Sequence, residues 1–127
     1  MKFQKIGTGD FGTIYEGLCG EEAIEFILKN EEGEMRAAFI HPYIAFPIDV
    51  VFGKTGEDGY GLAHIKEKHP EVLLKLSRMI ESGDVVNQGK DRKLIITEEG
   101  SKKDIVVIKL DWNGRSKTWI VSAFSKL

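Results

Sequence analysis

The sequence predicts an α+β domain in which N-terminal helices pack on an antiparallel sheet of four to five strands. Helix-type spacing of apolar residues ends near residue 83, and four β-rich runs with short turns follow. The length of 127 residues is typical of one domain, and 42% apolar and 30% charged residues are typical of a globular protein. We therefore expect a single domain over residues 1–127.

The first helix is expected over residues 20–33, GEEAIEFILKNEEG. Two glutamates open it, and its apolar residues at helical spacing are Ala23, Ile24, Ile27 and Leu28. The next segment, residues 35–53, holds short apolar runs interrupted by Pro42 and Pro47. Because proline disrupts a helix interior, this segment is expected to form edge strands or extended chain.

Two further helices are expected after the turn GEDGYG at residues 56–61. The stretch 61–69 is long enough for about two helical turns. Pro70 suits the first position of the next helix, 70–83, because its missing N–H is not needed there. Gly83 ends that helix, and its apolar stripe consists of Val72, Leu73, Leu76, Met79 and Ile80.

The last third of the chain holds four β-rich runs. They are DVVNQG, RKLIITEEG, KDIVVIKLDWNG and KTWIVSAF, separated by short turns that carry glycine or charge. Such spacing predicts an antiparallel meander with the helices packed on one face.

Composition and charge narrow the function classes. Residues 1–59 carry 5 basic and 11 acidic side chains, and residues 60–127 carry 13 and 9, so an anionic ligand is drawn to the second half. The single cysteine, Cys19, excludes an internal disulfide and a thiol cluster for zinc, and it favours a reducing compartment. No apolar run approaches the roughly 18 residues that span a bilayer, so no membrane association is expected.

The segment GLAHIKEKHPEV, residues 61–72, concentrates histidines and lysines on one short helix. His64 and Lys68, four positions apart, share a helical face, whereas His69 is turned roughly 140° away in a regular helix. The spacing of His64 and His69 is not that of a helical metal-binding pair, and no metal is expected. A solvated surface helix is the alternative to a functional site.

Arg92 and Ser122 lie on β-rich runs that can face this helix. RNA cleavage without a metal needs a base for the ribose 2′-hydroxyl, a cation for the phosphate and an acid for the leaving 5′-oxygen. Histidine suits either proton role, and arginine can donate two hydrogen bonds to one phosphate. Ser122 could hydrogen-bond the phosphate, but no base that would make it a nucleophile is evident.

Five blocks in this order resemble the nuclease domains of phages and polymorphic toxins grouped as barnase/EndoU/colicin/RelE-like. The blocks are PIDVVFG, GYGLAHIKEKHPEV, DRKLIITEE, DIVVIKLDW and TWIVSAF, and the likeness covers about residues 14–125. It implies a small α+β nuclease fold, no cofactor and metal-independent endoribonuclease activity that leaves a 2′,3′-cyclic phosphate. It also implies that the active site contains or borders His64, Lys68, His69, Arg92 and Ser122.

The roles expected from these residues follow their chemistry. His64 is the candidate general base or acid, and His69 is the second proton-transfer candidate or a structural cap. Lys68 and Arg92 are expected to stabilise the phosphate, and Ser122 to position it. Candidate substrate contacts are Lys66, Thr118 and Trp119. For Thr118, Trp119 and Trp112, packing within the sheet is the alternative role. Asp49 could orient a histidine or lysine, or it could form a turn.

The expected partners are RNA, with tRNA among the candidates, and an immunity or antitoxin protein that protects the producing cell. The expected site of action is the cytosol of a bacterial cell, reached in some systems as part of a larger delivered protein. Two other function classes remain open: a catalytically silent module that binds RNA or protein, and a phage structural or packaging accessory domain.

Overall fold

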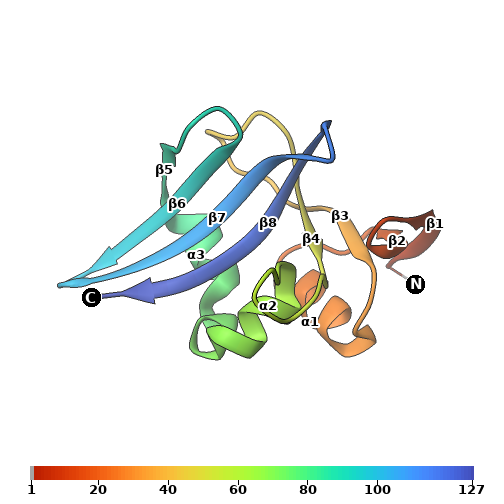
Figure 1. Ribbon diagram of the computed structural model, residues 1–127, viewed down its shortest axis with the longest axis horizontal. Coiled ribbons are helices and arrows are strands. Elements are labelled where there is room, and N and C mark those ends of the chain that lie inside the picture. Colours follow the sequence, from red (N-terminus) through yellow and green to blue (C-terminus); the bar gives the residue numbers. More distant parts are fainter. Residues whose placement is uncertain (1) are drawn as a thin grey trace.

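The computed structural model describes residues 2–127 as an α+β fold, an eight-stranded sheet with three α-helices and one 3-10 helix on one face (Figure 1). The strands are β1 (Gln4–Gly9), β2 (Gly12–Glu16), β3 (Glu34–Phe39), β4 (Ile48–Val51), β5 (Asp84–Asn87), β6 (Arg92–Glu99), β7 (Lys102–Trp112) and β8 (Arg115–Lys126). The helices are α1 (Glu21–Asn30), α2 (Gly61–Lys68), the 3-10 helix η1 (Pro70–Lys75) and α3 (Leu76–Ser82).

The strands lie in the order β1-β2-β3-β4-β8-β7-β6-β5. Most neighbours are antiparallel, but β2 and β3 are parallel, and so are β4 and β8. The four predicted β-rich runs form the antiparallel ribbon β5 to β8. The expected count of four to five strands is too low, because β3 and β4 extend the sheet and the hairpin β1–β2 adds two strands before the first helix.

Residues before the first helix gave no strand signal because β1 is exposed along its whole length. A strand that buries neither face shows no alternation of apolar and polar residues. Glycines also interrupt the segment, at Gly7, Gly9 and Gly12. The prediction that the helices precede the sheet is therefore wrong for the β1–β2 hairpin, which comes before α1 in the chain.

The predicted helix over 70–83 is two elements. Pro70 opens the 3-10 turn η1, and α3 follows from Leu76. The chain leaves α3 at Gly83, where a Cβ would lie 2.5 Å from a methyl carbon of Ile95. Close packing of the helix end on the sheet therefore favours glycine at this position.

The two faces of the sheet differ. The face under the helices carries the core side chains Ile95, Val106, Ile108, Ile120 and Ala123. The opposite face, here called the open face, carries the side chains that alternate with these along the strands. An irregularity leaves Val121 without a partner on β7, because Val107 pairs with Ser122 and Ile108 with Ile120. The bulge reverses the alternation along β8, so that Trp119 and Ser122 both lie on the open face.

Helix α2 lies alongside β8 (Figure 1). Strand β4 pairs with β8 only at Asp49 and Trp119, so the second half of β8 has no strand on that side. Helix α2 packs against β8 and thereby brings its polar residues to the edge of the sheet. Among residues 2–127, no helix is long and apolar enough to cross a membrane.

Candidate active site

The imidazole rings of His64 and His69 lie together, with ring centroids 5.6 Å apart. A continuous helix would turn them away from each other, but α2 ends at Lys68. His69 has φ −139° and ψ 52°, which directs the chain out of the helix. The early end of the helix therefore creates a histidine pair that periodicity alone did not predict.

His64 is suited to be neutral at physiological pH. Burial lowers its pKa below the ordinary value of 6.5, and the neighbouring His69 and Lys68 lower it further, with Glu67 opposing them. Its Nδ1 is buried and has no hydrogen-bond partner among residues 2–127. A neutral imidazole carries one unprotonated ring nitrogen, which can accept a proton.

The histidine pair adjoins the open face at the second half of β8. The ring of His69 lies 5.8 Å from that of Phe124, centroid to centroid. Ser122, two residues earlier on β8, is on the same face as Phe124 and is partly exposed. The structure thus brings the ring of His69 to Phe124 of the open face, two positions from Ser122 on the same strand.

Arg92 is on the open face but farther along the sheet. It pairs with Lys109, and Lys109 pairs with Trp119, so Arg92 lies two strands away from β8 and one row from Ser122. Its side chain is exposed, as are those of Lys66 and Lys68 on α2. Lys109 was missed by sequence reasoning, although its alternation with Val107 places both on this face.

Two predicted substrate contacts are buried. Thr118 is 7% exposed and Trp119 only 1% exposed. The indole of Trp119 packs against Phe11, Tyr60 and Trp112, with ring centroids 5.2 to 5.6 Å away, and its N–H donates to the Asp111 carbonyl. In this arrangement Trp119 packs within the sheet's aromatic cluster, and Trp112 keeps partly exposed surface.

A charged cluster lies nearby, centred on Lys117 of β8. Its ammonium group donates to the carboxylates of Glu34 on β3 and Asp49 on β4, the latter at 2.8 Å. Lys117 and Glu34 are largely buried, at 13% and 3% side-chain exposure. Asp49 thus orients a lysine, which is one of the two roles expected for it. The contact between Lys117 and Glu34 has no signal in the local sequence of either residue.

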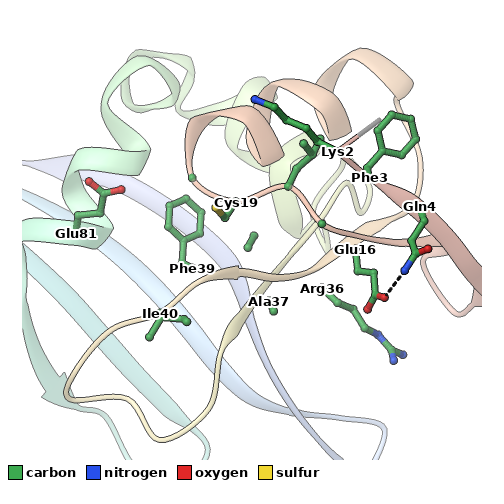
Figure 2. Close-up of a pocket in the computed structure, with 14 residues that line it drawn as sticks. Lys2, Phe3, Gln4, Glu16, Cys19, Arg36, Ala37, Phe39, Ile40 and Glu81 are labelled. Carbon is green, nitrogen blue, oxygen red and sulfur yellow. Dashed lines mark hydrogen bonds between the residues drawn. The ribbon is translucent and has the colours of Figure 1, made fainter.

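A large cavity lies elsewhere, in a region that none of the predicted site residues lines. It has a volume of about 680 Å³ and lies beside Cys19, Arg36 and Phe39, near the hydrogen-bonded pair Gln4 and Glu16 (Figure 2). Its lining comes from residues 2–40 and Glu81. Within residues 2–127, no three His, Cys, Asp or Glu side chains are grouped to hold a metal ion.

Comparison with known proteins identifies the family of the region that contains His64 and His69. Residues 46–127 match the sequence model of a family described as phage-Barnase-EndoU-ColicinE5/D-RelE like nuclease. The match covers 82 of the 127 residues, from just before β4 to the end of the sequence, and includes β8. No curated protein and no solved structure matches the chain. The chain therefore belongs to this phage barnase/EndoU/colicin/RelE-like family of nucleases.

Proposed function

We propose that the protein is a metal-independent endoribonuclease that cleaves RNA by attack of a ribose 2′-hydroxyl on the adjacent phosphate. The observation that carries the proposal is the pairing of His64 with His69 at 5.6 Å, beside the open face of a nuclease fold. Two imidazoles at this separation can both reach the groups around one phosphodiester.

His64 is the proton acceptor in this proposal. It takes the proton from the 2′-hydroxyl, and the resulting alkoxide oxygen forms a bond to phosphorus. The bond to the 5′-oxygen breaks, and that oxygen takes a proton from His69 in its imidazolium form. The products are a 2′,3′-cyclic phosphate and a 5′-hydroxyl. The lowered pKa of His64 supports its assignment as the base, because a base must be unprotonated when the substrate binds.

Lys68, Arg92 and Ser122 bind and stabilise the phosphate in this proposal. Lys68, next to the histidine pair, and Arg92, across the open face, balance the negative charge that builds on the phosphate oxygens. Ser122 donates a hydrogen bond to the same phosphate. Lys66, exposed on α2 between His64 and Lys68, contacts the substrate strand.

The test is incubation of the purified protein with total RNA in EDTA, followed by mapping of the fragment ends. Wild type is compared with His64→Ala and with Arg78→Ala, whose arginine is exposed on α3, on the helix side of the sheet. Cleavage by wild type and Arg78→Ala and its loss in a folded His64→Ala protein are expected. Intact RNA with a folded wild-type protein would instead favour the silent binding module.

We also propose an inhibitory protein partner that presents carboxylates to the open face. Residues 60–127 carry an excess of four positive charges, which attract an acidic surface as well as RNA. Such an inhibitor competes with RNA, and its affinity falls as salt concentration rises. An inhibitor whose footprint leaves His64 and Ser122 accessible would contradict this proposal.

A further inference from the structure

A second cavity, of about 530 Å³, lies at the other end of β8 from Ser122. It is enclosed by the tip of the β1–β2 hairpin on one side and the β7–β8 hairpin on the other. The aromatic and charged side chains that give it its binding chemistry include Asp10, Phe11, Arg36, Trp112, Arg115 and Lys117. Its volume is within the range of small-ligand sites.

The wall formed by the β1–β2 hairpin is fixed in place. Asp10 accepts a hydrogen bond of 2.9 Å from the indole N–H of Trp112. The ring of Phe11 packs between Trp112 and Trp119, at centroid distances of 4.8 and 5.2 Å. Residues that precede the family match therefore complete a pocket whose other wall belongs to the matched region.

The pocket offers the groups that a nucleobase requires. Trp112 is partly exposed and provides aromatic surface on which a base can stack, whereas the Phe11 ring lies under the Lys117 ammonium, 5.4 Å from its centroid, and supports Trp112 from the side. Charged groups of both signs surround the rings: three cations, Arg36, Arg115 and Lys117, and three carboxylates, Asp10, Glu34 and Asp49. Lys117 and Arg36 already contact the carboxylates of Glu34 and Asp49, so the pocket has no excess positive charge that would favour a phosphate by itself.

Cationic side chains of the open face lie between the pocket and the histidine pair. Lys117 contacts Asp49, which pairs with Trp119 of the open face, and Ser122 lies on the same face five positions along β8, at most about 16 Å of strand away. Lys109 and Arg92 lie beside the stretch between them. An RNA strand that follows these cations would bring its phosphate to His64 and a more distant base to the pocket.

We propose that this pocket binds a nucleobase of single-stranded RNA, a few nucleotides away from the cleaved phosphate, with Trp112 as the stacking surface. The inference rests on the proposed ribonuclease function. It assigns substrate selection to a subsite built jointly by the N-terminal hairpin and the family region.

The test is a scan of one short RNA in which a single abasic nucleotide is moved along the strand, so that every phosphate is kept. Wild type is expected to lose about tenfold in kcat/KM at one position remote from the cut and little at positions between. Trp112→Ala should remove this sensitivity. Arg115→Ala, which keeps the rings, should weaken it, and Arg78→Ala should leave it unchanged.

The same RNAs separate failure of the subsite from failure of the proposed function. If wild type cleaves and every remote abasic position is tolerated, the subsite is refuted while the ribonuclease stands. If wild type does not cleave, affinity for each labelled RNA is measured by fluorescence anisotropy. Weaker binding of the RNA with one abasic position, a difference that is lost in a folded Trp112→Ala protein and reduced in Arg115→Ala, supports the pocket, and equal affinities overturn it. Thermal melts identify any variant that has unfolded.

Discussion

Replacement of Lys117 by methionine is expected to destabilise the fold strongly. The substitution removes the cation that both Glu34 and Asp49 contact, so that the two carboxylates face each other and Glu34 keeps the half-exposed Arg36 at 3.8 Å. Glu34 is 3% exposed and Asp49 is 16% exposed, so water can solvate neither fully. Removal of one partner from a buried ionic cluster costs about 3–5 kcal/mol.

For a domain of this length, each kcal/mol corresponds to roughly 4 °C in Tm, so we expect a decrease of about 12–20 °C. The assay is thermal unfolding followed by circular dichroism. Lys103→Met is the matched control, since Lys103 is half exposed and pairs at 3.7 Å with the exposed Glu98. A surface pair of this kind contributes about 1 kcal/mol or less.

A triple variant, Lys117→Met with Glu34→Gln and Asp49→Asn, tests the cause. It removes the uncompensated charges and should recover most of the lost stability. Glu34 precedes the family match, whereas Asp49 and Lys117 are within it, so one cooperative transition in every variant is expected if residues 2–127 fold as one domain. A Lys117→Met protein that melts within about 2–3 °C of wild type would refute the reasoning.

Three further predictions concern the site and its support. Ser122→Thr should retain cleavage of a short RNA, whereas Ser122→Ala should reduce the single-turnover rate about 10- to 100-fold, the worth of one hydrogen bond to a charged group. Because the pKa of His64 is lowered, the acidic limb of kcat/KM against pH should have its midpoint below 6.5; a midpoint above 6.5 would assign the base elsewhere. Burial by itself would raise the pKa of Asp104, but the Ser125 hydroxyl and Lys75 together hold it below its ordinary value. Asp104→Asn should therefore lower the free energy of unfolding at pH 7 by about 1–3 kcal/mol, and the difference from wild type should vanish in melts at pH values below the folded pKa.

Features with a local signal could be predicted from the sequence. Helix α1 follows from its glutamates and apolar spacing, and β5 to β8 follow from β-rich runs between turns. Pro42 and Pro47 predicted an interruption within the segment 35–53, and the structure has a loop there, at residues 40–47 between β3 and β4. The family could be identified because five blocks keep their order along the chain, and residues 46–127 match it.

Two local departures from regular geometry could not be predicted. The pair of His64 and His69 exists because α2 stops after Lys68, and periodicity assumes that a helix continues. The bulge at Val121 reverses the alternation along β8, so simple counting does not relate Trp119 to Ser122.

Long-range polar contacts are also invisible to local patterns. The hydrogen bond from Trp112 to Asp10 joins residues 102 positions apart. Lys117 and Glu34 are 83 positions apart. Each residue is ordinary in its own segment, and only the order of the strands in the sheet brings the partners together.

The most direct measurement of the central claim uses two RNAs that differ in one oxygen atom. The first is a short RNA that wild type cleaves at one bond in EDTA, and the second carries a 2′-deoxy nucleotide immediately 5′ of that bond. Cleavage of the first to a 2′,3′-cyclic phosphate by wild type but not by His64→Ala, with the second intact, is the predicted result. Cleavage of the 2′-deoxy substrate at the same bond would contradict 2′-hydroxyl attack, and unchanged cleavage by a folded His64→Ala protein would contradict the site.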